Sequence, residues 1–185
     1  MKVPGIIEEA IAAHGGQDLW SRAGSIEAEL TVRGFLFLAK QRKPLDHVTA
    51  RASTGKPVFS FLDFPSAGLN SELLGPDEVR ITGREGAVIR KRLRPREAFR
   101  GLRRLFSWDD LDFAYFGGYA TWNYLTAPFL FLEEGFGFEE LPGFVTKEGI
   151  WERVKVTFPD AIPTHSREQV FYFDEERLLR RLDYT

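Results

Sequence analysis

The spacing of apolar residues changes along the chain and predicts which segments are helices and which are strands. Between residues 4 and 15, apolar side chains recur at three- and four-residue intervals, which predicts a short opening helix. From residue 26 to residue 32 every second residue is apolar, as in a half-buried strand. The apolar run Phe35–Leu38 is expected to continue this strand beyond a bulge at Gly34.

Further alternating segments are separated by turn residues and predict a series of strands. These strands are expected over residues 46–53, 58–64, 78–82, 87–93, 136–140, 150–158, 167–173 and 178–184. Pro95 is expected to open a helix that runs to about residue 106. Residues 109–127 are expected to form two helical pieces joined at Gly117-Gly118, because each glycine inside a helix costs roughly 1 kcal/mol. Short turns between neighbouring strands predict an α+β fold, a curved antiparallel sheet or incomplete barrel whose concave face is plugged by helices.

The composition is that of one folded domain spanning residues 1–185, because no linker or shift in composition divides the chain. The 17 phenylalanines are many for this length, against a single methionine. A formal net charge of -2 gives no global attraction to nucleic acid, so no nucleic-acid partner is expected. The absence of cysteine excludes disulfides, thiolate nucleophiles and cysteine-ligated zinc.

The amino-terminal residues do not have the pattern of an export signal. Glu8 and Glu9 interrupt the apolar stretch that a signal peptide needs, so a cytoplasmic protein is expected. The most apolar region, residues 113–132, contains glycine, asparagine and proline and is not a predicted membrane span.

Aromatic residues are densest between Trp108 and Leu132, where rings recur at helical spacing. We expect these rings to face phenylalanines of the strands and to line an apolar cavity under the helices. The alternative is a filled core without a cavity. The expected lining residues are Phe35, Phe37, Phe59, Phe61, Tyr115, Tyr119, Trp122, Leu125 and Phe129.

Basic residues are concentrated between residues 80 and 104, where only Glu85 and Glu97 oppose them. The expected helix after Pro95 would carry several of these side chains on one face. One hypothesis is that Arg100, Arg103 and Arg104 hold the anionic head group of a ligand at the cavity mouth. A second is peripheral contact with an anionic membrane. A third is a solvated face whose charges pair with Asp109, Asp110 and Asp112.

The chain shows no established catalytic motif, and no catalytic residue, metal site or cofactor is expected. The aspartates of residues 109–112 are interpreted as helix-start residues, which favour the positive end of the helix dipole. His14, His47 and His165 lack the spacing of a metal site, and His14 is expected to lie at a helix end. The alternative is an enzyme in which His165 or one of these aspartates acts as a general base.

Two groups of residues carry a resemblance to a known family: His14-Gly-Gly followed by Trp20, and the closing hairpin over residues 168–184. They resemble the LolA-like superfamily of lipoprotein carriers. The segments Trp108–Leu111 and Trp122–Phe129 are similar to an uncharacterised bacterial branch of that superfamily. The resemblance implies an incomplete β-barrel, helices at its mouth and a hollow that accepts acyl chains. Since such proteins continue into further strands, it also implies a shortened carboxy-terminal sheet edge.

Together these patterns favour binding over catalysis. The leading hypothesis is a protein that buries a hydrophobic ligand, such as a fatty acyl chain or other lipid, under the helices of residues 108–132 and acts as a carrier or sensor. Enzymatic action on a hydrophobic substrate in the same cavity is the first alternative. An interaction module whose aromatic rings form only a core is the second.

Overall fold

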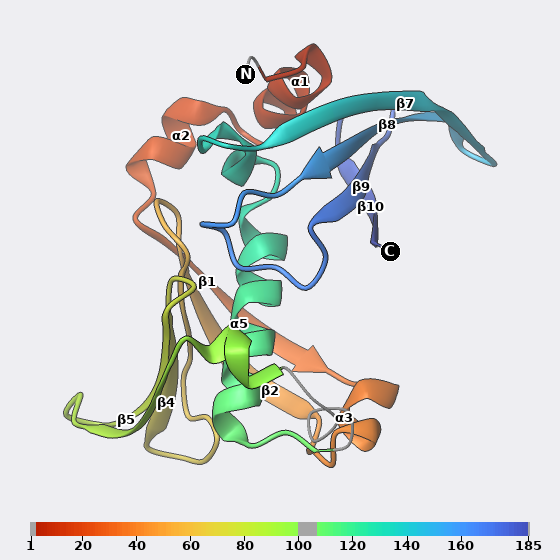
Figure 1. Cartoon of the computed structure of the whole chain (residues 1–185). Helices are drawn as coiled ribbons and strands as arrows, with labels where there is room; N and C mark the ends of the chain where they lie inside the picture. The colour runs from red at the N-terminus through yellow and green to blue at the C-terminus, as the bar shows by residue number, and fades with distance from the viewer. Residues whose placement is uncertain (1–2, 100–106, 185) are drawn as a thin grey trace. The chain divides into compact units, whose positions relative to one another are not determined.

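The computed structural model describes residues 3–99 and 107–184, which divide into two compact units (Figure 1). Unit 2 is Gly24–Leu125, and unit 1 combines the segment that ends at Ala23 with the segment that begins at Thr126. The described residues contain one antiparallel sheet of six strands and one of four. The prediction of an α+β fold with antiparallel sheets and helices is therefore confirmed.

Unit 2 contains the six-stranded sheet, whose strands pair in chain order β1-β2-β3-β4-β5-β6. The strands β2 to β6 follow one another through turns and short loops, as expected for an antiparallel meander, whereas the helix α3 lies between β1 and β2. Its elements are β1 (Ser25–Val32), α3 (Phe35–Ala39), β2 (Leu45–Ser53), β3 (Val58–Phe61), β4 (Leu69–Leu74), β5 (Glu78–Gly83), β6 (Val88–Leu93), the 3-10 helix η1 (Pro95–Phe99) and α5 (Asp110–Thr126), whose last residue belongs to unit 1.

Unit 1 contains the four-stranded sheet, in the order β10-β9-β8-β7. Its elements are α1 (Gly5–Ala13), α2 (Gln17–Arg22), the 3-10 helix η2 (Phe129–Leu132), β7 (Gly137–Thr146), β8 (Gly149–Thr157), β9 (Glu168–Phe173) and β10 (Leu179–Tyr184). Paired residues Val154 of β8 and Phe171 of β9 are buried. The Phe131 ring of η2 meets the Phe171 ring edge-on at 4.8 Å. The core of this unit is therefore rich in phenylalanine.

The expected strand over Phe35–Leu38 is wrong, because these residues form the short helix α3. The strand β1 ends at Val32, and Gly34 has a φ of 150° that turns the chain before the helix. A register irregularity between Leu30 and Val32 lies just before this turn. A run of four apolar residues fits either element, and here the turn at Gly34 decides for the helix.

The expected joint at Gly117-Gly118 is also wrong, because α5 is one continuous helix. A Cβ atom added at Gly117 would lie 3.2 Å from the Phe61 ring, and one added at Gly118 would lie 3.3 Å from the Leu73 Cβ. The two glycines therefore allow α5 to lie directly on the inner face of the sheet. This close packing offsets their low helix propensity.

Other boundaries differ from the sequence-based expectations. The strand β4 was not predicted, and β7 extends to Thr146 instead of ending near residue 140. The expected strand over 58–64 ends at Phe61. Of the helix expected from Pro95, the part over 95–99 is a 3-10 helix, and residues 100–106 lie outside the described residues. No helix in the described ranges has both the length and the apolar character that crossing a bilayer requires.

Candidate ligand-binding site

The predicted strand rings Phe59 and Phe61 lie on the inner face of β3. Their centroids are 4.7 Å apart in an edge-on arrangement, and each residue is 1% exposed. Phe61 also packs beside Phe64 and Phe113, with ring centroids 5.7 and 6.5 Å away. Since α5 contacts both strand rings through its glycines, this part of the helix–sheet interface is closely packed.

The predicted rings of α5 are buried, and the structure brings Tyr115 and Tyr119 together. Their centroids are 5.1 Å apart, and the Phe99 ring lies 5.7 Å from that of Tyr115. Burial raises the pKa of Tyr115, partly offset by the charge of Arg96, so the phenol is neutral at physiological pH. Trp122 is fixed by its indole N–H, which donates to the Ser53 carbonyl oxygen at 2.8 Å. Leu125, at the end of the same helix, is half-buried.

The remaining predicted lining residues differ from one another in where they lie. Phe129 belongs to unit 1, where it stacks on Trp20 with centroids 4.3 Å apart and planes at 3°. Phe35 is 81% exposed on α3, whereas Phe37 is buried with its ring 5.5 Å from that of Phe113. Arg100, Arg103 and Arg104 lie outside the described residues.

The aspartates at the start of α5 act as caps, as the sequence indicated. The backbone N–H of Asp112 donates to Asp109 Oδ1 at 2.8 Å, and the N–H of Asp109 donates to Asp112 Oδ2 at 3.1 Å. This reciprocal pair satisfies backbone donors that the first helical turn leaves open.

The same aspartates pair with arginines of β6 and of the turn after α3. Arg92 forms ion pairs with Asp109 and with Asp112, which is 3% exposed. Arg42 and Arg90 both pair with Asp110. The interpretation of the basic span as a face paired with aspartates is thereby confirmed for Arg90 and Arg92.

The pKa values of Asp110 and His165 matter for the alternative that one of them acts as a general base in an enzyme. Burial alone would raise the pKa of Asp110, but hydrogen bonds and charge from Arg90 and Arg42 outweigh it and lower the pKa. A carboxylate held by two guanidinium groups is a weak base. Burial also lowers the pKa of His165, whose ring meets Tyr184 edge-on at 4.2 Å. His14 lies at the end of α1, where Nδ1 is 2.7 Å from the Ala10 carbonyl oxygen, as predicted for a helix end.

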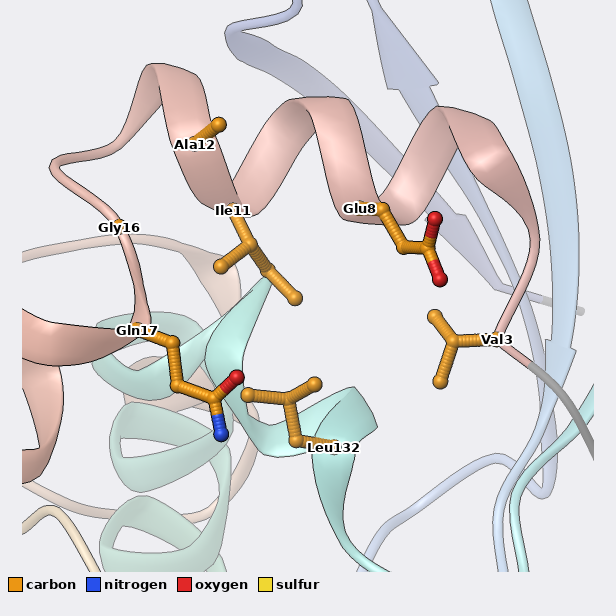
Figure 2. A pocket seen from close by; sticks show the side chains of 7 residues that line it. All are labelled: Val3, Glu8, Ile11, Ala12, Gly16, Gln17 and Leu132. Atoms are coloured by element: carbon orange, nitrogen blue, oxygen red, sulfur yellow. The ribbon is translucent and has the colours of Figure 1, made fainter.

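A pocket of about 390 Å³ lies in unit 1, beside α1 (Figure 2). We call it the α1 pocket, lined by Val3, Glu8, Ile11, Ala12, Gly16, Gln17 and Leu132. Glu8, Ile11 and Ala12 share one face of the helix, because they are three and four residues apart. In Figure 2 the side chains of Ile11, Gln17 and Leu132 converge from one end, and those of Val3 and Glu8 approach from the other. Its volume is in the range of small-molecule sites.

A second pocket of about 380 Å³ adjoins the first, since Val3 and Leu132 line both. Its lining also includes residues Phe131, Phe136 and Phe138. The carboxylates of Glu133 and Glu134 also line it. The two pockets together form a groove lined by both apolar and acidic residues.

Unit 2 has a larger but more polar pocket, of about 510 Å³. Apolar contributions come from Leu45, Val48, Phe64 and two prolines. Most of its other lining is charged or polar: Gln41, Arg42, Lys43, Asp46, Asp63 and Asp110. Pairing of Arg42 with Asp110 already neutralises two of these charges.

Sequence reasoning missed the α1 pocket. The pattern of α1 reveals its buried face, on Ile6, Ile7 and Ala10, but Glu8 and Ala12 are exposed. The opposing wall, Leu132, lies far along the chain, so only the fold brings it near α1. The i, i+3, i+4 spacing of Glu8, Ile11 and Ala12 was the available signal, and it does not differ from that of an ordinary solvent-facing flank.

Within the described residues, no group of three or more histidine, cysteine, aspartate or glutamate residues could hold a metal ion. Comparisons of the chain with models of protein families, with curated proteins and with solved structures found no match. The function of the site is therefore inferred from the geometry of its residues alone.

Proposed function

We propose that this protein binds an apolar small molecule, such as a fatty acyl chain or another lipid, and acts as its carrier or sensor. The observation that carries the proposal is the α1 pocket together with the adjoining pocket that shares Val3 and Leu132. Val3, Ile11, Ala12 and Leu132 give the α1 pocket an aliphatic lining, and burial of an apolar chain against them supplies the binding energy.

The groove of unit 1 supports the proposal better than the interface between α5 and the six-stranded sheet. At Gly117 and Gly118 even an added Cβ atom would lie only 3.2 and 3.3 Å from side chains of the sheet, so an acyl chain could enter there only by displacing packed side chains. The pocket of unit 2 is larger but bordered by several charged groups, whose desolvation would oppose an apolar ligand.

The polar groups of the α1 pocket favour an uncharged head group. Figure 2 shows the Gln17 amide and the Glu8 carboxylate at its opposite ends. An amide can donate and accept hydrogen bonds, and an ionised carboxylate accepts them. A hydroxyl head group can donate to Glu8, whereas the carboxylate of a fatty acid would be repelled by it.

Fluorescence titration with the uncharged apolar dye Nile red tests the proposal. The bulky substitution Ala12→Trp fills the pocket, and we expect it to weaken dye binding at least tenfold. Ala13→Trp is the matched control, since Ala13 is also exposed at the end of α1 but does not line the pocket. Equal binding by the two variants, or no binding by the parent protein, would contradict the proposal.

Competition between dodecanol and dodecanoate tests the head-group preference. Dodecanol should displace Nile red at lower concentration than dodecanoate does, and Glu8→Gln should narrow the difference. Glu9→Gln is the control, because Glu9 pairs with Arg177 and does not line the pocket. A parent protein that prefers dodecanoate would overturn the assigned preference while leaving apolar binding intact.

A further inference from the structure

The short helix α3 and the end of β1 expose large apolar side chains close together in the chain. We call this surface the α3 patch: Val32, Phe35, Leu36 and Leu38. Phe35 and Leu38 are 81% and 76% exposed. Exposed apolar side chains this close together are uncommon on a surface that meets only water, and they indicate a binding surface.

The patch is held in place from beneath. Phe37 is buried beside Phe113, and the backbone N–H of Arg42 donates a hydrogen bond to the Phe37 carbonyl oxygen at 2.8 Å. Arg42 is also paired with Asp110 at the start of α5. The exposed side chains are therefore presented by a fixed turn of helix, so binding does not require α3 to fold first.

The charged residues of the chain segment that carries the patch have one sign. Residues 31–43 contain Arg33, Lys40, Arg42 and Lys43 and no aspartate or glutamate. Lys43 is exposed and forms no ion pair with another described residue, and Arg33 has only an exposed partner, Asp46, at 3.3 Å. The Lys40 ammonium group lies over the Trp108 ring, 5.2 Å from its centroid. Apolar side chains bordered by basic ones match the boundary between acyl chains and anionic head groups.

We propose that the α3 patch docks on an anionic lipid surface, with Phe35 and Leu38 entering the acyl boundary and the basic residues meeting the head groups. Anionic lipid fits better than a second copy of this chain. A symmetric dimer through the patch would bring the basic border of one copy against that of the other. The proposal uses no residue of the α1 pocket and does not depend on the proposed function.

Vesicle co-sedimentation of the full chain tests the proposal. One set of vesicles contains phosphatidylcholine alone, and the other contains phosphatidylcholine with phosphatidylglycerol. We expect the protein to bind the anionic vesicles at least tenfold more tightly, and to lose most of this binding at about 0.5 M salt, where the Debye length is short. The double variant Phe35→Ser/Leu38→Ser should lower binding at least tenfold, and Lys43→Ser should lower it by a smaller factor.

The matched control is Val145→Ser/Ile150→Ser. These residues are 77% and 60% exposed on the β7–β8 hairpin, and the change removes comparable apolar surface elsewhere. It should bind vesicles as the parent does, and thermal unfolding should show both double variants folded. Absence of parent binding to anionic vesicles, equal binding to neutral vesicles, or equal loss in the control would each overturn the proposal. So would a parent dimer that Phe35→Ser/Leu38→Ser converts to a monomer. Loss of Nile red binding alone would bear only on the proposed function.

Discussion

Two phenylalanine pairs with the same spacing have different environments in unit 2. Phe59 and Phe61 are buried on β3 beneath α5, whereas Phe35 points to solvent from α3 and only Phe37 is buried. Residue type and spacing alone therefore do not determine burial. The difference in burial between the two pairs comes from the residue between the two rings of each pair and from the residue that precedes the second pair.

Ser60 separates the first pair and gives β3 the two-residue alternation of a strand with one buried face. Leu36 separates the second pair, so Phe35–Leu38 is a continuous apolar run without a preferred period. Gly34, with its positive φ, then breaks the strand before this run begins. The first pair became core and the second became a helix with an exposed apolar face.

The largest effect is expected from truncating the buried pair. Phe61→Ala removes a ring that is 1% exposed and packed against α5, and should lower the free energy of unfolding by about 3–5 kcal/mol. Phe35→Ala, the same change at a solvent-exposed ring, should alter it by no more than about 0.5 kcal/mol. Urea unfolding followed by circular dichroism measures both. Similar losses in the two variants would show that the exposed ring is part of the core.

Phe37→Ala tests whether α3 is anchored as its geometry indicates. This ring is buried beside Phe113, but it belongs to a helix of five residues, so the loss should lie near the lower end of the range, about 3 kcal/mol. The measurement is again urea unfolding, with Leu38→Ala of the same helix as the exposed control. If both changes cost under about 0.5 kcal/mol, α3 is not anchored through Phe37.

Where the sequence-based fold was right, local pattern and tertiary packing agreed. The alternation in β1, β8 and β9 was strong enough to predict these strands. In β4 it was not, because polar Ser71 is buried and Leu74, of the opposite parity, is apolar. For α5, helix propensity alone favoured a break at its two glycines. Only the sheet beneath, which no local pattern shows, explains why the helix continues.

The Gly118→Leu substitution tests whether close packing on the sheet keeps α5 continuous. It should lower the free energy of unfolding by less than the phenylalanine truncations do. Its side chain would have to displace Leu73 and Phe59, and overpacking minus the gain in helix propensity leaves a loss of about 1–2 kcal/mol. Gly55→Leu is the control, since a Cβ at Gly55 meets no atom within 4 Å. Thermal unfolding of the two variants measures the difference. A Gly118→Leu protein more stable than the parent would mean that α5 does not lie closely on the sheet.

The candidate site was less predictable than the fold. The aromatic residues that the sequence singled out are mostly buried, but Phe35 is exposed on α3, and Phe129 belongs to unit 1 and stacks there on Trp20. The α1 pocket depends on Leu132 meeting α1, a contact between distant segments. Likewise the α3 patch follows from a helix where the sequence indicated a strand. Whether the buried rings also contact a ligand stays a prediction.

The smallest expected change in the free energy of unfolding comes from Asp110, whose carboxylate pairs with Arg42 and so links the turn after α3 to α5. Arg42 and Arg90 lower the pKa of Asp110 against the opposing effect of burial, so the ionised form is more stable in the folded chain than in the unfolded one. This contribution is complete above the ordinary aspartate pKa of 3.8 and disappears as the pH falls through the lower, folded-state pKa. Asp110→Asn should therefore cost up to about 1 kcal/mol at pH 7, because the pair is partly exposed.

Urea unfolding of the parent and of Asp110→Asn between pH 7 and pH 2.5 measures this contribution, and the difference should shrink toward acid pH. Asp160→Asn is the control, because Asp160 is exposed and lies 3.6 Å from Arg167 in a solvent-screened pair. Its effect should stay under about 0.5 kcal/mol at every pH. A difference for Asp110→Asn that is constant across this range would mean that Asp110 contributes through its shape or capping and not through its charge. The charge of Asp110 would then add nothing to the hold on the α3 turn, and the contrast between the two phenylalanine pairs would be a matter of packing without this ion pair.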